Sequence, residues 1–316
     1  MKTKITTDPM EAAEFIRLGG LVAFPTETVY GLGADIFNER AVAKVFAAKG
    51  RPADNPLIAH ISDKDQIELL AEEFTDAAAR LIDAFFPGPL TVVLRKQATV
   101  PAVASAGLDT IGIRMPSDFV ARKFLAACGT PVVAPSANLS GCPSPTSFRA
   151  VFEDLNGRID CMLRGNDAEI GLESTVIDCS AERAVILRPG AISIEMVRKI
   201  LPDAEFADPA KLEIARSPGM KYRHYAPRAA VKIVVKGEIV PDAENAGYIG
   251  CGIPSQNFRL RAQCKSADDY AARLFEFFRE CDRRGIRTIY CESVAPEGIG
   301  RALLDRLRRA AGITDA

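Results

Sequence analysis

The sequence predicts an α/β (α+β) protein with a mixed sheet in its first two-thirds and a small α/β layer at its end. Up to about residue 200, short Val/Ile-rich runs alternate with amphipathic helical patterns, which is typical of a sheet covered by helices. Several of these runs lie only a few residues apart, too close for a crossover helix, so some strands must pair antiparallel. The length of 316 residues also favours two domains at roughly 150 residues each.

The individual elements follow from periodicity and from turn residues. The predicted strands of the first part are 21–25, 57–61, 90–95, 111–114, 131–134, 161–164, 174–178 and 184–188. The predicted helices are 9–18, 39–49, 64–71, 75–85, 118–127, 147–154 and 193–200.

A proline-rich stretch separates this part from the next. Prolines at 202, 209, 218 and 227 break any regular element between about 202 and 229. After it come the strands VKIVV and AGYIG, a helix at 266–284, the strand RTIYCES and a helix at 297–310, an order that resembles a small Rossmann-like layer. We therefore expect a catalytic domain at 1–205, a linker or lid at 206–229 and a C-terminal α/β domain at 230–316.

Composition excludes several classes of protein. The first twenty residues lack the apolar core of a signal peptide, and no apolar run approaches the ~20 residues of a membrane helix. The eight cysteines form no C-x-x-C pair, which argues against zinc or disulfide frameworks and favours a reducing, cytoplasmic compartment. With a net charge of -1, strong direct binding of nucleic acid is not expected, and any anion site must be a local cluster of Lys and Arg.

The standard nucleotide and hydrolase motifs are absent from the sequence. It contains no GxxxxGK[ST] loop, no GxGxxG after a strand, no HExxH and no GxSxG. The glycine clusters at 31–33 and 247–252 are interpreted as turns rather than as cofactor loops.

Polar residues instead gather in five segments at strand ends and in Pro/Gly loops, where a sheet can aim them at one ligand. In the first, FPTETVYGLGAD, a strand ends at Pro25 and leads Thr26, Glu27, Thr28 and Tyr30 into a turn. Taken alone, this segment is better explained as a capped turn with an ordinary tyrosine.

The second segment, KGRPADNPLIAH, follows a predicted helix with two cations. Lys49 and Arg51 flank a glycine, Asn55 lies in the loop, and the next strand reaches His60. The two cations could face a bound anion or simply complement the helix dipole. His60 is one of only two histidines. A histidine near a strand end is more often structural than catalytic, but an ordinary pKa near 6.5 makes it a candidate for proton chemistry.

The third segment, DTIGIRMP, places Thr110 and Arg114 on one face of a strand. An arginine that faces inward from a largely apolar strand needs an anionic partner, whether a carboxylate or a ligand.

The last two segments offer hydroxyl groups and one more cation. The loop PVVAPSANLSGCPSPTS carries Ser136 and Ser144 and offers hydroxyl and N–H groups to phosphate oxygens, unless it is a plain surface loop. The adjacent strands ESTVID and AVILRPG can present Ser174 and Arg188 to the same cavity. Together with Lys49, Arg51 and Arg114 this predicts a cationic pocket that suits a small polyanion and a polar amino acid.

The strings FPTETVYGLGAD, KGRPADNPLIAH, TIGIRMP, APSANLSGCPSPTS, ESTVID and LRPG resemble those of the YrdC-like family of threonylcarbamoyl-AMP synthases. SPGMKYRHYAP, followed by a small domain, is similar to the linker of the longer, two-domain form. The resemblance implies a twisted mixed sheet around a basic cavity that holds both substrates. It implies synthesis of threonylcarbamoyl-AMP from L-threonine, bicarbonate and ATP, with Mg²⁺ bound mainly through ATP phosphates and the product passed to the enzymes that modify tRNA.

The resemblance also implies roles for individual residues. Those expected at L-threonine are Thr28, His60, Arg114, Ala134 through its backbone, and Ser174. Those expected at ATP are Arg51, Asn55, Thr110, Ser136, Ser144, Arg188, His224 and Tyr225. Lys49 and Arg51 are expected to stabilise charge during the reaction, and no protein-held metal is expected.

Two other functions remain open from the sequence. A factor that binds RNA would be favoured by a basic cavity and by the KYRHYAPR segment, although no RNA-recognition motif is present. A carbamoyl-adenylate synthase of hydrogenase maturation would use a similar domain, but that system carries zinc-finger cysteine pairs, which this sequence lacks.

Overall fold

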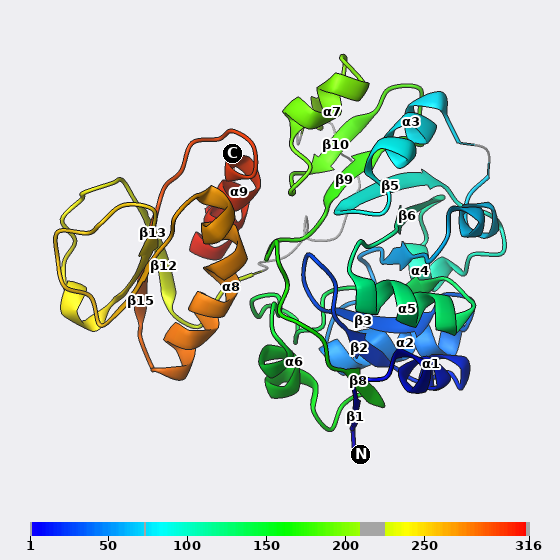
Figure 1. Ribbon diagram of the computed structural model, residues 1–316, viewed down its shortest axis with the longest axis horizontal. Helices are drawn as coiled ribbons and strands as arrows, with labels where there is room; N and C mark the ends of the chain where they lie inside the picture. Colours follow the sequence, from blue (N-terminus) through cyan, green and yellow to red (C-terminus); the bar gives the residue numbers. More distant parts are fainter. Residues whose placement is uncertain (1, 73, 209–224, 314–316) are drawn as a thin grey trace.

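The computed structural model describes residues 2–72, 74–208 and 225–313 of the chain, and they form two sheets with helices packed on them (Figure 1). The large sheet has eleven strands in the order β1-β8-β2-β3-β7-β4-β6-β5-β9-β10-β11, and the small sheet has four in the order β12-β15-β13-β14. The large sheet contains both parallel and antiparallel pairs, so the predicted mixed sheet is confirmed.

The strands of the large sheet are short and mostly buried. Their bounds are β1 Lys4–Thr6, β2 Val22–Phe24, β3 Gly31–Asp35, β4 Ile58–His60, β5 Leu90–Arg95, β6 Thr110–Arg114, β7 Val132–Val133, β8 Cys161–Leu163, β9 Thr175–Asp178, β10 Val185–Arg188 and β11 Glu205–Phe206. The helices of this domain are α1 Pro9–Arg17, α2 Glu39–Lys49, α3 Asp76–Phe85, α4 Ala102–Ser105, α5 Phe119–Cys128, α6 Phe148–Leu155 and α7 Ile194–Ile200.

Two predicted elements take another form. The GLG cluster is not a turn but belongs to strand β3, where an added Cβ on Gly33 would lie 2.8 Å from Cγ1 of Val132. The glycine therefore permits close strand packing and needs no positive φ. The predicted helix at 64–71 is a 3₁₀ helix, Lys64–Leu69, that begins at the capping carboxylate of Asp63.

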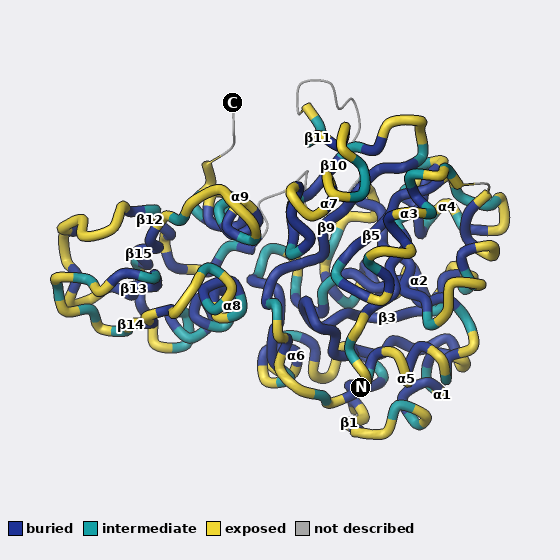
Figure 2. The backbone as a smooth tube through the Cα atoms, turned by 45° about the horizontal axis from the view of Figure 1, so that its top comes forward, coloured by how far each residue is buried: buried dark blue, intermediate teal, exposed yellow. Residues whose placement is uncertain are grey.

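The buried side chains of the large domain lie on both faces of its sheet. One core cluster joins α2, α3 and β3–β6, and a second packs α1 and α5 against β2 and β8. Figure 2 shows these strands as buried, and the loops 25–30 and 171–174 at their ends are buried as well. The polar residues of the loops at the strand ends are thus held on a rigid frame.

The C-terminal domain is an all-parallel α/β layer. Its strands are β12 Ala230–Val234, β13 Gly247–Gly250, β14 Leu260–Gln263 and β15 Thr288–Glu292, and its helices are α8 Ala267–Arg283 and α9 Gly300–Ala311. The cluster GYIGCG supplies strand β13, not a turn at its start. Both helices lie between the small sheet and the large domain, so their side chains can reach the large domain (Figure 1).

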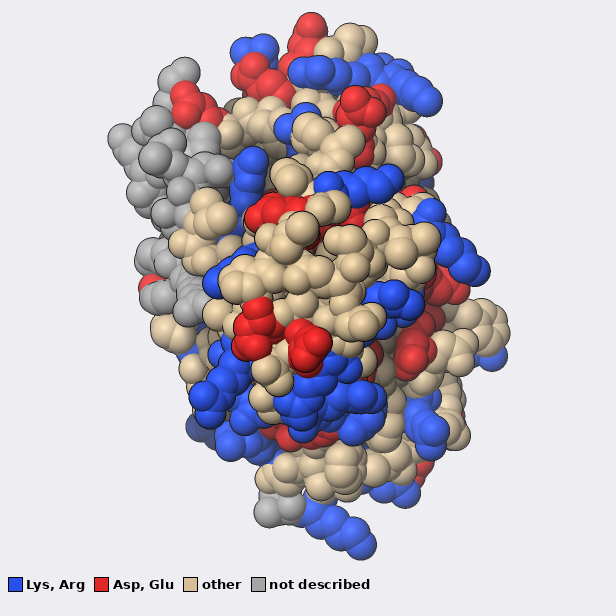
Figure 3. Space-filling model, turned by 90° about the vertical axis from the view of Figure 1, so that its left-hand side faces the viewer, with Lys and Arg blue, Asp and Glu red and all other residues tan. Residues whose placement is uncertain are grey.

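Lys and Arg side chains also lie on the surface of the C-terminal domain. Figure 3 shows Lys and Arg side chains gathered below the middle of the face that the C-terminal domain presents. Exposed arginines in this domain include Arg259, Arg284 and Arg287. Within the described ranges, no helix combines the length and the apolar character that crossing a bilayer requires.

Candidate active site

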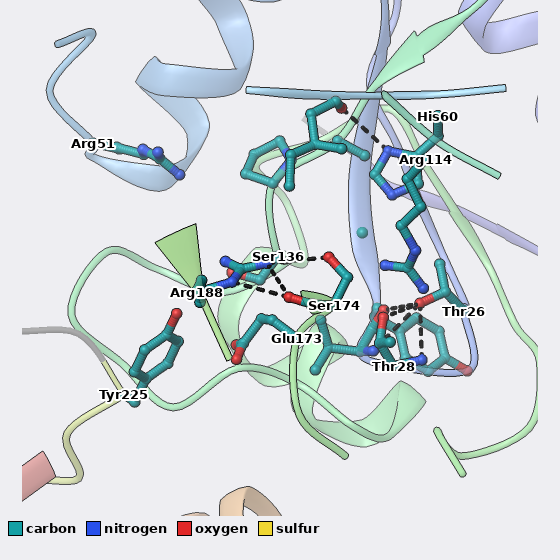
Figure 4. A pocket seen from close by; sticks show the side chains of 16 residues that line it. Thr26, Thr28, Arg51, His60, Arg114, Ser136, Glu173, Ser174, Arg188 and Tyr225 are labelled. Carbon is teal, nitrogen blue, oxygen red and sulfur yellow. Dashed lines mark hydrogen bonds between the residues drawn. The ribbon is translucent and has the colours of Figure 1, made fainter. Parts of the chain in front are cut away.

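One cavity collects side chains from both ends of the large domain's sequence and from residue 225 (Figure 4). Most of the predicted site residues line it, and they come from the loop after β2, the end of α2, strands β4 and β6, the loop after β7 and the strand pair β9–β10. These lining residues are Thr28, Arg51, His60, Arg114, Ala134, Ser136, Ser174, Arg188 and Tyr225. In Figure 4, Arg114 and Thr28 lie toward one end of the cavity, and Arg51 and Tyr225 lie toward the other.

A buried ion pair forms one end of the cavity. Nη2 of Arg114 lies 2.7 Å from Oε1 of Glu27, and both side chains are about 5% exposed. Oε2 of Glu27 and Nε of Arg114 have no hydrogen-bond partner among the residues that the structure describes. The pair therefore retains one unused acceptor and one unused donor. The sequence placed Glu27 in a turn beside the site, but no pattern in it indicated this pairing.

His60 is a neutral imidazole in this cavity. Its Nδ1 lies 3.2 Å from the carbonyl oxygen of Ile58, and a carbonyl only accepts, so Nδ1 carries the hydrogen and Nε2 is an acceptor. Burial, and then the positive charge of Arg114, lower the pKa of His60 from 6.5 to about 3. At neutral pH the ring therefore offers an acceptor rather than a positive charge.

The strand pair β9–β10 supplies a cation and a hydroxyl, as the sequence predicted. Nη2 of Arg188 donates to the carbonyl oxygen of Ser174 at 3.0 Å and to its Oγ at 3.2 Å. That Oγ also lies 2.8 Å from Oγ1 of Thr91. Burial lowers the pKa of Arg188, but an arginine remains charged at neutral pH.

Arg51 is the second cation of the cavity wall. It follows Gly50, whose left-handed φ of 61° ends α2 and turns the chain toward the cavity. Burial lowers the pKa of Arg51 to about 10, which still leaves it charged at pH 7. Its Nη2 donates to the backbone carbonyl of Asn55 at 3.3 Å, so the loop between them is closed by this contact.

Lys49 is buried behind the wall rather than in it. Its ammonium donates to the carbonyl oxygens of Ser136 and Asn138, the latter at 2.6 Å. Burial, and then the charge of Arg51, lower its pKa well below the usual value. The structure therefore separates the two predicted cations: Arg51 faces the cavity, and Lys49 holds the Ser/Asn loop that lines it.

Three further predicted residues lie beside the cavity. Oδ1 and Nδ2 of the buried Asn55 find no hydrogen-bond partner in the described part of the chain. Thr110 lines a neighbouring small cavity, and Ile58 lines both cavities. Oγ of Ser144 donates to Oε1 of Glu173 at 2.5 Å, and Glu173 itself lines the main cavity.

Tyr225 closes the cavity from the side of the C-terminal domain. Its ring stacks on Phe275 of α8 with centroids 5.5 Å apart, and the guanidinium of Arg306 lies 5.4 Å from its centroid. His224, the other residue predicted in this segment, lies outside the described residues.

The cavity is built for positioning and for charge neutralisation. It combines fixed cations with hydroxyl groups and a neutral imidazole, and the described residues contain no group of three or more His, Cys, Asp or Glu side chains placed to hold a metal ion. Such a site can hold a polyanion at one end and an amino acid at the other, and align the two for reaction.

Comparisons with known proteins agree with this architecture. The family model described as "Telomere recombination", named for Sua5, YciO and YrdC, matches residues 14–190. The model "Threonylcarbamoyl-AMP synthase, C-terminal domain" matches residues 192–312. A threonylcarbamoyl-AMP synthase of Pyrococcus abyssi is 45% identical over 95% of this chain and 93% of its own length. The Bacillus subtilis protein of the same name is 40% identical over 97% of this chain and 94% of its own length.

Solved structures give the same result. The crystal structure of P. abyssi Sua5 complexed with L-threonine has a TM-score of 0.90 and 42% identity, covering 99% of this chain and 97% of that one. A variant of that Sua5 with His and Tyr replaced by Ala at two successive positions has a TM-score of 0.91. The chain belongs to the Sua5–YciO–YrdC family, and its C-terminal part belongs to the family of threonylcarbamoyl-AMP synthase C-terminal domains.

Proposed function

We propose that this chain is an L-threonylcarbamoyladenylate synthase, a nucleotidyltransferase that makes threonylcarbamoyl-AMP for the formation of threonylcarbamoyl-adenosine in tRNA. The observation that carries the proposal is the cavity itself, because it joins an end with Arg114 and a neutral His60 to an end with two phosphate-type cations. Relatives named threonylcarbamoyl-AMP synthase that match along nearly the whole chain support the same assignment.

L-Threonine is assigned to the end formed by Arg114 and His60. The carboxylate would lie on Arg114, whose Nε is an unused donor, with Thr28 and Ser174 beside it. The Nε2 acceptor of His60 suits a hydroxyl or amine hydrogen. The Ala134 backbone lines the same end, although its N–H donates to the Ile58 carbonyl at 2.9 Å.

ATP is assigned to the other end. Arg51 and Arg188 would face its phosphates, with Ser136 and Tyr225 on the cavity wall. We keep Asn55, Thr110, Ser144 and His224 as proposed contacts of the nucleotide. Arg51 would contact the phosphates directly. Lys49 would influence the phosphates only indirectly, by holding the loop of Ser136 and Asn138 in place.

The reaction needs no covalent enzyme intermediate. The amine of threonine adds to carbon dioxide, derived from bicarbonate with loss of water, and gives a carbamate. A carbamate oxygen then attacks the α-phosphorus of ATP, and the bond to the β-phosphate oxygen breaks, so that pyrophosphate leaves. The protein's share is to align the carbamate with the α-phosphate and to neutralise the charge on the phosphates.

Mg²⁺ is proposed to arrive with ATP. This ion keeps several waters and is commonly bound through substrate phosphates, where it neutralises their charge. Glu173 is the carboxylate that lines the ATP end, but its two oxygens accept from Ser144 and pair with Arg306. We therefore assign the ion to the phosphates rather than to that side chain.

The remaining proposals concern the compartment, the fate of the product and the domain bounds. We propose the cytoplasm as the compartment, in keeping with eight cysteines that are free thiols. The product would pass to the enzymes that attach it to tRNA. We propose 1–205 as the catalytic domain, 206–229 as a linker or lid, of which 209–224 lie outside the described residues, and 230–316 as the C-terminal domain.

Pyrophosphate release tests the proposal. We expect release only when ATP, Mg²⁺, bicarbonate and L-threonine are all present, because the nucleophile is the adduct of the amino acid with carbon dioxide. Equal release with serine or alanine in place of threonine would contradict the assignment of the substrate.

A further inference from the structure

The C-terminal domain holds the loop that leads into β9. Gly171 has φ +75°, and an added Cβ there would lie 2.5 Å from Cα of Ala272 in helix α8. The next residue, Leu172, is fully buried and belongs to the core cluster of the C-terminal domain, together with Phe275 and Leu303. A segment of the catalytic domain is thus packed into the core of the other domain.

An ion pair follows this packing contact directly. Arg306 of α9 is fully buried, and its Nε lies 3.0 Å from Oε2 of Glu173. Its Nη1 donates to the Pro189 carbonyl at 3.0 Å, on the turn after β10. Burial alone would raise the pKa of Glu173, but the charges of Arg306 and Arg188 and the hydrogen bond from Ser144 together outweigh burial, and the pKa lies below its ordinary value. Glu173 is therefore a carboxylate held in place from the C-terminal domain.

The same carboxylate belongs to the cavity wall. Its other oxygen, Oε1, accepts from Ser144, a proposed contact of ATP. The residue that follows it is Ser174, whose carbonyl and hydroxyl oxygens both accept from Arg188. The Arg306 guanidinium also lies over the ring of Tyr225 (Figure 4 shows Glu173, Arg188 and Tyr225 on one side of the cavity). One side chain of α9 therefore contacts two elements of the nucleotide end.

We propose that Arg306 is a positioning residue for the reaction, which acts through Glu173 on Ser144 and through its own contact on Tyr225. The C-terminal domain would then complete the nucleotide end of the site, and docking of the two domains would be linked to binding of ATP. Without Arg306, a buried carboxylate would lose its counter-charge and either take up a proton or turn toward water. Either change weakens or breaks the hydrogen bond that Ser144 donates to Glu173. The identity of the nucleotide rests on the proposed function.

The test compares the full-length Arg306→Met and Arg306→Lys variants with the wild-type protein. Calorimetric titration with a non-hydrolysable ATP analogue measures affinity directly, and steady-state kinetics separate KM for ATP from kcat. We expect Arg306→Met to weaken binding of the analogue by about tenfold, with a larger change in KM than in kcat. Arg306→Lys should recover part of the affinity, because it restores the charge without the fork geometry.

A matched control removes another ion pair between the same domains. Arg283 of α8 lies 3.0 Å from Glu153 of α6, and neither residue lines the cavity. Arg283→Met should leave binding of the analogue unchanged. Equal losses of affinity in Arg283→Met and Arg306→Met would overturn the proposal, since any weakening of the domain contact would then suffice.

The double variant Arg306→Met/Glu173→Leu separates positioning from stability. It removes both charges, so the free energy of unfolding should recover relative to Arg306→Met alone. Affinity for the analogue should stay low, because Ser144 still lacks its acceptor. The positioning role would be refuted if the double variant recovered both the free energy of unfolding and the affinity for the analogue. Wild-type affinity in Arg306→Met would also refute it. A wild-type protein that binds the analogue but makes no threonylcarbamoyl-AMP would refute the proposed function and leave this comparison valid.

Discussion

The ammonium of Lys49 lies 2.6 Å from the carbonyl oxygen of Asn138 and ties the end of α2 to the loop after β7. Both residues are buried, so the hydrogen bond has little competition from water. Ser136, on the same loop, lines the cavity and also accepts from this ammonium. The contact makes the shape of the cavity wall depend on a cation that does not itself face the cavity.

We therefore expect Lys49→Met to lower both activity and stability. Loss of this donor leaves the carbonyls of Ser136 and Asn138 unpaired, at a cost of about 1–3 kcal/mol in the free energy of unfolding. Activity should fall through a higher KM for ATP, because the loop is no longer fixed. Lys44→Met on the same helix is the control, since Lys44 is exposed and donates to the Gly19 carbonyl away from the cavity. Unchanged stability in Lys49→Met, by urea titration, would contradict this account.

Arg51→Ala should lower kcat rather than stability. Its guanidinium lines the cavity, so its loss removes a phosphate-facing charge and should reduce kcat by about 10²–10³-fold with little change in stability. Arg40→Ala, an exposed arginine of α2, is the control. If Arg51→Ala turned over within a few fold of wild type, Arg51 would have no role in the reaction and would only complement the dipole at the C-terminus of α2.

Local sequence was sufficient to predict most of the sheet and most of the cavity wall. Strand-end residues such as His60 and Arg114 could be placed because a strand fixes the direction of its side chains and adjacent strands share an edge. Ser174 and Arg188 could be paired because their strands are too close in sequence for anything but an antiparallel contact.

The contacts that the sequence did not reveal join residues far apart in the chain. Glu173 pairs with Arg306 across 133 positions, and no periodicity connects a loop carboxylate with a helix of another domain. Lys49 was expected in the cavity because its neighbour Arg51 belongs there. Which of the two faces inward depends on the left-handed turn at Gly50 and on the loop packed against it.

The depressed pKa of His60 predicts a pH dependence of stability. Burial, and then Arg114, lower its pKa to about 3 in the folded chain, whereas an unfolded histidine titrates near 6.5. Between these values the unfolded chain binds the proton more strongly, so acidification below about pH 6.5 should reduce the free energy of unfolding by up to ~1.4 kcal/mol per pH unit. His60→Gln should lack this contribution, and His224→Gln should keep it. Urea titrations at a series of pH values check both, and equal slopes in wild type and His60→Gln would refute the assignment.

Substitution of Tyr225 tests whether the linker covers the nucleotide or only connects the two domains. The Tyr225 ring lines the cavity between Phe275 and Arg306, so Tyr225→Ala should raise KM for ATP or release AMP and pyrophosphate without product, because water then reaches the reacting groups. Tyr225→Phe keeps the ring and should retain most of the activity. Protease cleavage of the linker should also slow when ATP and threonine are both present. Wild-type kinetics in Tyr225→Ala, together with a cleavage rate that does not depend on ATP or threonine, would show that the linker only connects the domains.

We propose above all that one cavity joins threonine, carbon dioxide and the adenylyl group of ATP. The most direct measurement is mass spectrometry of the products formed from ATP, Mg²⁺, L-threonine and ¹³C-labelled bicarbonate. We expect threonylcarbamoyl-AMP that carries one ¹³C atom, in amounts equal to the pyrophosphate released. Pyrophosphate accompanied by unlabelled threonyl-AMP, or by AMP alone at every concentration of bicarbonate, would contradict it.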